Sequence, residues 1–252
     1  MNSALQRFSL TGKQALVTGG SRGIGHALAL GLSEAGAQVT ITGRDANSLA
    51  LALDSLHKID PSARAEVVDV TQQGDIERLF TKISPDIVIN NAGTEQLCPS
   101  LEVDEALWQR IIDTNLKGAF FTAQAAARQM QQRGGGSIIN LCSLTSEVGV
   151  PGAAAYGASK SGLLGLTRAL SSEWASKNIR VNAIGPGYFS TDLTAEFYQD
   201  RQWCERMLEK IPLGRFGELD DLVGAGIFLS SDAARYITGQ VIYIDGGYLA
   251  SI

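Results

Sequence analysis

Cysteine and histidine are scarce in this chain of 252 residues. The three cysteines, Cys98, Cys142 and Cys204, are widely spaced and form no CxxC pair. This arrangement fits neither a disulfide framework nor a zinc site, and it predicts buried or half-buried free thiols. The two histidines, His26 and His57, have no second type of ligand at metal spacing. The sequence therefore predicts no metal site and no histidine-based catalytic triad.

Long apolar runs and an excess of basic residues are also missing. No stretch approaches the roughly 18 uninterrupted apolar residues of a membrane span, and the first residues lack the apolar block of a secretory signal. The 21 Lys and Arg residues against 26 Asp and Glu give a net charge of −5, which argues against non-specific nucleic-acid binding. We expect a cytoplasmic protein that binds neither membrane nor nucleic acid.

The composition is that of an ordinary globular domain. Hydrophobic residues make up 44% and charged residues 19% of the sequence, which supplies enough apolar material for a sizeable core. No internal repeat, charge block or Pro/Ser-rich linker divides the chain. Residues 1–252 are therefore predicted to form one domain.

Short runs of β-branched and other apolar residues alternate with segments of helical spacing. The predicted strands are residues 14–18, 38–42, 64–68, 86–90, 137–142, 179–184 and 240–244. The predicted helices are residues 26–35, 46–57, 75–83, 104–132, 156–177 and 219–230. This alternation predicts an α/β Rossmann fold, a doubly wound seven-stranded parallel sheet with helices on both faces. Such sheets bind ligands beyond the carboxyl ends of their strands.

One long segment departs from the alternation. Residues 185–213 follow the sixth predicted strand and carry several aromatic residues in a partly amphipathic setting. We interpret them as a mobile lid over a substrate pocket. The alternative is a pair of short surface helices packed down for core reasons.

Glycine is in excess, with 28 residues of 252 against roughly 7% in ordinary soluble chains. The first predicted strand leads through the sequence TGGSRGIG into a helix. Gly19, Gly23 and Gly25 would let the backbone approach a pyrophosphate, whose charge the N–H groups of the helix N-terminus would meet. The loop predicts a dinucleotide site, although its spacing is GxxxGxG rather than GxGxxG. The other loop residues assigned to the cofactor are Ser21, Arg22 and Ile24.

The end of the second predicted strand, Thr42-Gly43-Arg44-Asp45, bears on the choice of cofactor. An acid there would bind the ribose 2′-hydroxyl of NAD(H), and a basic residue the 2′-phosphate of NADP(H). Arg44 can hold a phosphate through two hydrogen bonds, and Arg22 can join it. We expect NADP(H) to be preferred. Asp45 leaves NAD(H) as a possible cofactor. The alternative for Arg44 is a solvated surface charge with no role in binding.

A tyrosine and a lysine stand four residues apart at the head of a predicted helix. Tyr156 and Lys160 therefore share one helix face, and Ser143 follows the fifth predicted strand. A phenol with a pKa near 10 is a poor base at neutral pH, but a neighbouring ammonium and an oxidised nicotinamide lower that pKa. Tyr156 is thus predicted to act as an acid/base group.

These features together resemble the short-chain dehydrogenase/reductase family. The shared motifs are TGGSRGIG at 18–25, NNAG at 90–93, Asn115, Ser143, YGASK at 156–160 and GPG at 185–187. They follow the family order and spacing over essentially the whole chain. Tyr156, for example, stands thirteen residues after Ser143.

The resemblance implies roles for individual residues. Tyr156 would be the acid/base, Lys160 would hold the nicotinamide ribose and tune Tyr156, and Ser143 would orient the substrate oxygen. Asn115 would lie in a locally distorted helix and relay protons from Lys160, unless it is merely a polar residue satisfied within the helix. Asp69 would accept a hydrogen bond from the adenine amine. The remaining residues assigned to the cofactor are Val70, Asn90, Ala92, Gly93, Pro186, Gly187 and Thr191.

The implied reaction is hydride transfer between a nicotinamide and a carbonyl carbon, or its reverse from a secondary alcohol. The runs PGYFSTDLT at 186–194 and KIPLGRFGELDDLVGA at 210–225 are most similar to the branch of gluconate 5-dehydrogenases and deoxy-sugar-acid dehydrogenases. We therefore expect a sugar acid or polyol as substrate, with Glu147 and Tyr188 as candidate contacts. A solvated loop acid is the alternative for Glu147.

The resemblance implies a homotetramer. It also leaves three alternatives to the proposed function. A 3-oxoacyl-carrier-protein reductase would share the catalytic residues; Arg128 matches one basic position of those enzymes, whereas the second falls at Ser172. Reduction of steroid or xenobiotic ketones is a further possibility. A nucleotide-sensing protein without turnover is the alternative from outside the enzymes.

Overall fold

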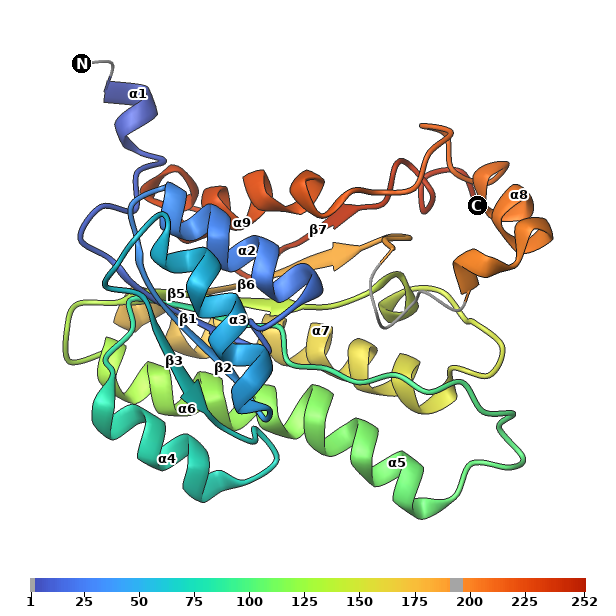
Figure 1. Ribbon diagram of the computed structural model, residues 1–252, viewed down its shortest axis with the longest axis horizontal. Helices are drawn as coiled ribbons and strands as arrows, with labels where there is room; N and C mark the ends of the chain where they lie inside the picture. Colours follow the sequence, from blue (N-terminus) through green and yellow to red (C-terminus); the bar gives the residue numbers. More distant parts are fainter. Residues whose placement is uncertain (1–2, 191–196) are drawn as a thin grey trace.

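The computed structural model describes residues 3–190 and 197–252, and its centre is a sheet of seven strands that all pair in parallel (Figure 1). The strands are β1 (Gln14–Thr18), β2 (Gln38–Gly43), β3 (Arg64–Val67), β4 (Ile87–Asn90), β5 (Gly136–Leu141), β6 (Ile179–Pro186) and β7 (Val241–Ile244). Their order across the sheet is β3-β2-β1-β4-β5-β6-β7. The predicted doubly wound fold is confirmed, and β6 extends to Pro186, beyond its predicted end.

Helices cover both faces of the sheet. The α-helices are α1 (Ser3–Gln6), α2 (Gly23–Glu34), α3 (Ala46–His57), α4 (Gln73–Lys82), α5 (Glu105–Ile112), α6 (Gly118–Met130), α7 (Ala154–Trp174), α8 (Arg201–Leu208) and α9 (Val223–Ser230). In Figure 1, α2, α3 and α9 lie above the sheet, and α4, α5, α6 and α7 lie below it. Within the described ranges, no helix is long and apolar enough to span a membrane.

Two apolar clusters hold the layers together, one on each face of the sheet. In β1, Val17 packs into the cluster with α2 and α9, while its neighbour Leu16 packs into the cluster with α4, α6 and α7. Successive side chains of a strand point to opposite faces. Because both faces are covered, the central strands are buried almost throughout, as their continuous apolar runs predict.

The predicted helix over residues 104–132 is not continuous. A π-helical turn, Asp113–Lys117, separates α5 from α6. It contains Asn115, where the family resemblance implies a distortion. The Asn115 amide is buried; its Oδ1 accepts from Thr94 N at 2.7 Å and its Nδ2 donates to Ser159 Oγ at 3.0 Å. The extra residue of a π-turn turns this side chain toward the β4 loop and α7.

Candidate active site

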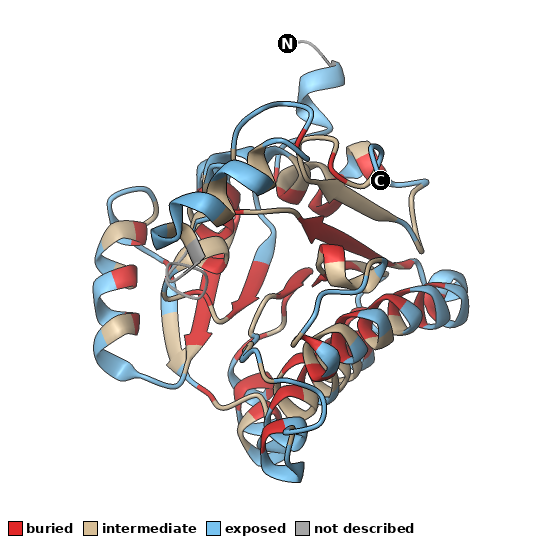
Figure 2. Ribbon diagram, turned by 90° about the vertical axis from the view of Figure 1, so that its right-hand side faces the viewer, coloured by how far each residue is buried: buried red, intermediate tan, exposed pale blue. Residues whose placement is uncertain are grey.

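A cavity of about 470 Å³ opens along the carboxyl edge of the sheet. Figure 2 looks onto this edge, with buried strands in the middle and exposed helix faces outside them. Residues from the β1–α2 loop, the ends of β2 to β6, the start of α7 and the region of α8 line it. The predicted site residues that line it are Gly19, Ser21, Arg22, Gly23, Ile24, Gly25, Arg44, Asp69, Val70, Ala92, Gly93, Ser143, Tyr156, Lys160, Pro186, Gly187 and Tyr188.

The glycine loop forms one end of the cavity. Gly19 and Gly23 have φ of +63° and +53°, which side chains disfavour. A Cβ on Gly25 would collide with Asn91 Nδ2 and the Gly19 carbonyl. The first turn of α2 has no side-chain cap at Arg22, so its backbone N–H groups remain available for an anion beside the cavity.

The two asparagines of the NNAG motif make different contacts. Asn91, to which the sequence analysis assigns no role, donates from Nδ2 to the carbonyl oxygens of Thr18 at 3.0 Å and Gly19 at 2.9 Å, and so holds the glycine loop. Asn90 does not line the cavity, contrary to prediction. It is buried and donates to Asn140 Oδ1 at 3.0 Å and to the carbonyl of Ala119. The end of β4 turns its side chain to the interior.

Arg44 and Asp45 follow each other at the end of β2, but only Asp45 uses its side chain for hydrogen bonds within the described part of the protein. Asp45 caps α3: its Oδ1 accepts from Ser48 N at 2.7 Å and Ser48 Oγ at 2.6 Å, and these bonds hold the pKa of Asp45 below its usual value. Arg44 lines the cavity without a hydrogen bond or ion pair to any residue in the described ranges. The guanidinium is therefore available to a ligand.

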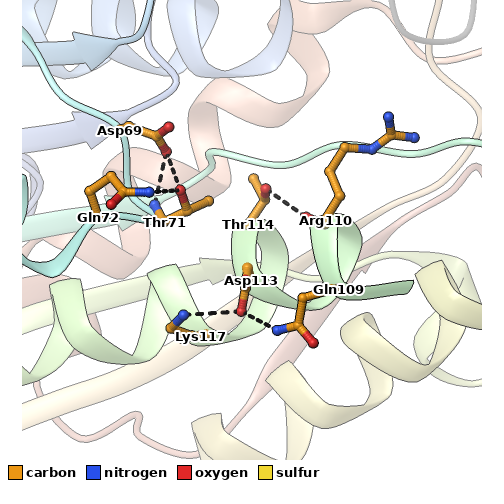
Figure 3. A network of polar contacts seen from close by, with 8 residues as sticks. All are labelled: Asp69, Thr71, Gln72, Gln109, Arg110, Asp113, Thr114 and Lys117. Atoms are coloured by element: carbon orange, nitrogen blue, oxygen red, sulfur yellow. Dashed lines mark hydrogen bonds and ion pairs between the residues drawn. The ribbon is translucent and has the colours of Figure 1, made fainter. Parts of the chain in front are cut away.

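Asp69 follows β3 and is oriented by its own loop. Its Oδ1 accepts from Thr71 N at 2.9 Å and Thr71 Oγ1 at 2.8 Å (Figure 3), while Oδ2 makes no hydrogen bond to a residue of the described ranges and Asp69 lines the cavity. Figure 3 also shows the π-helical turn beside it, where Thr114 Oγ1 donates to the Arg110 carbonyl at 2.8 Å. Thr114 lines the cavity as well, so β3 and this turn form two neighbouring walls.

Ser143, Tyr156 and Lys160 come together at the other end of the cavity. Ser143 follows β5 and hydrogen-bonds to Tyr156, the third residue of α7. Lys160, one helical turn further, places its Nζ 5.6 Å from the centre of the Tyr156 ring and donates to the Leu141 carbonyl at 2.6 Å. The three side chains predicted to act together are thus in mutual reach.

The pKa of Tyr156 shifts against expectation. Burial, and after it the charge of Glu95, raises the pKa of the phenol above its usual value, while the hydrogen bond from Ser143 opposes the shift. Burial also lowers the pKa of Lys160. The sequence predicts that an ammonium together with an oxidised nicotinamide lowers the pKa of Tyr156; the protein groups alone raise it, chiefly by desolvation.

Three further residues line the cavity: Glu95 has no predicted role, whereas Tyr198 and Trp203 are aromatic residues of the segment interpreted as a lid. Glu95, two residues beyond the NNAG motif, is half-buried next to the Tyr156 end, and burial raises the pKa of its carboxyl group. Tyr198 and Trp203 join the predicted Tyr188 in an aromatic wall, with ring centres 5.6 Å apart in both the Tyr188–Trp203 and Tyr198–Trp203 pairs. Cys142 is a buried free thiol, and Cys98 and Cys204 are half-buried free thiols, as predicted.

Two predicted contacts do not belong to the described cavity. Glu147 does not line it, because its Oε1 accepts a hydrogen bond from the Tyr243 hydroxyl at 2.9 Å. Glu147 is an exposed residue of the loop after β5, and this bond ties it to β7. Thr191 lies outside the described residues, as does part of the segment interpreted as a lid. Asn115 stands just behind the cavity wall.

Known proteins match the chain over nearly its full length. The family described as "Enoyl-(Acyl carrier protein) reductase" matches residues 19–249. Gluconate 5-dehydrogenase of Gluconobacter oxydans (strain 621H) is 40% identical, with 97% of this chain and 98% of that protein covered. A crystal structure from Sinorhizobium meliloti 1021, provisionally called a short-chain alcohol dehydrogenase, is 55% identical at a TM-score of 0.95 and covers 98% of this chain and 100% of its own.

A second solved structure carries ligands. Gluconate 5-dehydrogenase from Burkholderia cenocepacia J2315, in complex with NADP and tartrate, is 37% identical at a TM-score of 0.94, with 99% of this chain and 100% of that chain covered. The site geometry, the sheet and these matches agree. The chain belongs to the short-chain dehydrogenase/reductase family of oxidoreductases and, within it, is similar to gluconate 5-dehydrogenases.

Proposed function

We propose that this protein interconverts a ketone and a secondary alcohol on a sugar acid or polyol, with NADP(H) as hydride carrier. The observation that carries the proposal is the joint position of Ser143, Tyr156 and Lys160 in one cavity whose far end is the glycine loop before α2. The similarity to gluconate 5-dehydrogenases supports the substrate class.

The residues at the glycine-loop end suit NADP(H). The uncapped N-terminus of α2 suits the pyrophosphate, and the free guanidinium of Arg44 suits the 2′-phosphate. Asp45 is committed to capping α3, which leaves it a poorer acceptor for the ribose hydroxyls of NAD(H). Asp69 Oδ2 is positioned to accept from the adenine amine, beside Val70 and Ala92. When bound, the cofactor supplies or accepts the hydride.

Side chains of this protein transfer the proton that accompanies the hydride. Tyr156 gives a proton to the carbonyl oxygen or removes one from the alcohol, and Ser143 orients that oxygen by a hydrogen bond. Lys160 and the oxidised nicotinamide favour the phenolate and counter the burial that raises the pKa of Tyr156. A Cβ on Gly93 would lie 3.4 Å from Asn115 Oδ1 and 3.7 Å from Lys160 Nζ, so this glycine lets the two polar groups face one space. That arrangement supports a proton relay through Asn115.

Loss of the Tyr156 hydroxyl tests the proposal. Tyr156→Phe should abolish NADPH consumption with 5-ketogluconate, deoxy-keto-sugar acids and a neutral ketose, because the ring remains but the proton donor is gone. NADPH binding, followed by its fluorescence, should stay nearly unchanged. Near-normal turnover in the variant would refute the assigned role.

Reduction of a carrier-bound 3-oxoacyl group is the second candidate, because Leu97, Leu144 and Val150 give the cavity an apolar side that suits an acyl chain. Arg128, the predicted carrier contact, is exposed on α6 and does not line the cavity. An acetoacetyl thioester in the same assay separates the two. Turnover of the thioester alone would replace the sugar proposal.

We further propose that the protein works in the cytoplasm as a homotetramer, and that residues 185–213 cover the substrate. The edge strand β7 supports assembly, since all four of its residues are only partly buried. Light scattering that finds a single 26.7 kDa species would refute the assembly.

A further inference from the structure

Glu95 is an acid that lines the cavity without a partner among the described residues. It lies in the chain between β4 and α5, which Figure 1 shows running past the carboxyl edge of the sheet. It makes no hydrogen bond or ion pair to any residue of the described ranges, yet it is close enough to Tyr156 and Lys160 to affect the pKa of both. A half-buried carboxylate without a donor is costly unless a ligand supplies one.

Among the residues that the structure describes, no cation at the substrate end is placed to receive a second negative charge. Of the cationic residues that line the cavity in the described ranges, Arg22 and Arg44 belong to the cofactor end. The third, Lys160, is buried behind Tyr156 and bonded to the Leu141 carbonyl. Arg110 donates to Gln96 and does not line the cavity. Residues 191–196, TDLTAE, contain two acids and no lysine or arginine in the sequence.

The other groups near Glu95 suit a neutral, hydroxylated ligand. Tyr188 and Trp203 line the cavity as an edge-on pair of rings, and aromatic rings suit the C–H groups of a polyol. Tyr198 adds a buried hydroxyl that has no hydrogen-bond partner within the described part of the chain. A carboxylate and a hydroxyl are good acceptors for a row of hydroxyl groups, and both are poor partners for another carboxylate.

We propose that Glu95 selects the substrate, accepting hydrogen bonds from its hydroxyl groups and excluding a carboxylate at that position. This inference rests on the proposed function and narrows it: the substrate is an uncharged polyol or its keto form rather than a sugar acid. Glu95 is then a specificity-determining residue, and Ser143, Tyr156 and Lys160 remain the groups that act on the reacting oxygen.

A purely electrostatic role makes a different prediction. If Glu95 only balanced the charge of Lys160, its neutralisation would change the turnover of all substrates by the same factor. If it contacts the substrate, its neutralisation changes the ratio between a charged and an uncharged substrate. The ratio is therefore the measurement that separates the two roles.

Glucitol and gluconate form a matched pair, because they differ only in a CH₂OH group against a carboxylate at one carbon. With NADP⁺, we expect kcat/KM of the wild-type protein to favour glucitol by about tenfold or more, since a like charge in a half-buried site is strongly disfavoured. Glu95→Gln, of nearly equal shape, should reduce that preference by about the same factor, chiefly by lowering KM for gluconate. Glu95→Arg should reverse it.

Glu102→Gln is the matched control. Glu102 belongs to the same connection between β4 and α5, is exposed and does not line the cavity. Its neutralisation should leave the ratio unchanged. A shift of the same size in both variants would overturn the inference, because it would point to long-range charge rather than contact.

The remaining outcomes separate this inference from the proposed function. Preference of the wild-type protein for gluconate, unchanged in Glu95→Gln, overturns the inference and leaves the sugar-acid function in place. Turnover of neither compound above the Tyr156→Phe blank counts against the proposed function. In that case, calorimetric titration of NADP⁺-loaded Tyr156→Phe protein decides the inference: gluconate bound as tightly as glucitol overturns it, and weaker binding of gluconate supports it.

Discussion

The two ends of the cavity are built from different materials. The cofactor end consists mainly of backbone: the turn at Gly19 and Gly23, the uncapped N-terminus of α2 and the carbonyls held by Asn91. The substrate end consists of side chains from segments far apart in sequence, including Glu95, Tyr188 and Trp203. A backbone site is shared across a family because it needs only glycines at fixed spacing, whereas a side-chain site can be rebuilt by single substitutions.

The largest effect should follow a methyl group added at the backbone end. Gly25→Ala places a Cβ against Asn91 Nδ2 and the Gly19 carbonyl, neither of which can move without opening the glycine loop. We expect the free energy of unfolding to fall by about 1–3 kcal/mol and NADPH binding to be lost. Thermal unfolding and NADPH fluorescence titration measure the two effects.

Gly165→Ala provides the control for that change. Gly165 lies in α7, and a Cβ there would meet no atom within 4 Å. Because alanine favours a helix interior over glycine, this variant should be as stable as the wild type or more stable. Intact NADPH binding in Gly25→Ala would show that the glycine loop tolerates a side chain. The proposed difference between the cofactor end and the substrate end would then be wrong.

A smaller effect is expected at Arg44, a cationic side chain of the cofactor end. Arg44→Ser should raise KM for NADPH by about 10- to 100-fold, because a charge-assisted bidentate contact is lost. KM for NADH should change little, which makes NADH the internal control. Equal KM values for NADPH and NADH in the wild-type protein would contradict a contact between Arg44 and the 2′-phosphate.

The smallest effect concerns the pH dependence of substrate choice. Burial raises the pKa of Glu95, so its negative charge develops at a higher pH than that of an ordinary glutamate. The preference for glucitol over gluconate should therefore grow by a few fold as pH rises through that pKa, and it should stay flat in Glu95→Gln. A ratio in the wild-type protein that does not vary with pH would contradict the prediction.

Other titrating groups at this end do not mimic that behaviour. Tyr156 and Lys160 of α7 and Cys142 after β5 share this part of the cavity with Glu95. Burial raises the pKa of Tyr156 and Cys142, which keeps both protonated at neutral pH. The pKa of Lys160 is lowered, and a change in the protonation of Lys160, or of Tyr156 with the oxidised nicotinamide bound, would act in the wild type and in Glu95→Gln alike. The comparison of the two proteins isolates Glu95.

Sequence reasoning succeeded where a pattern has one structural meaning. The alternation of apolar runs predicted all seven strands, and the spacing between Tyr156 and Lys160 predicted their shared helix face. It failed for the side chain of Asn90, which faces the interior instead of the cavity, and it did not predict the hydrogen bond between Tyr243 of β7 and Glu147. In both cases the chain offers a polar residue near a strand end, and only packing decides which way it points.

The sequence by itself determined the doubly wound sheet, the glycine turn after β1 and the set of candidate reacting groups, because each depends on local spacing along one or two adjacent elements. Only the tertiary structure decided that Glu95 lines the cavity without a partner among the described residues, that Asn91 rather than Asn90 supports the glycine loop, and that burial raises the pKa of Tyr156. Orientation and desolvation depend on atoms contributed by distant segments, and the order of residues along the chain does not reveal which segments will meet.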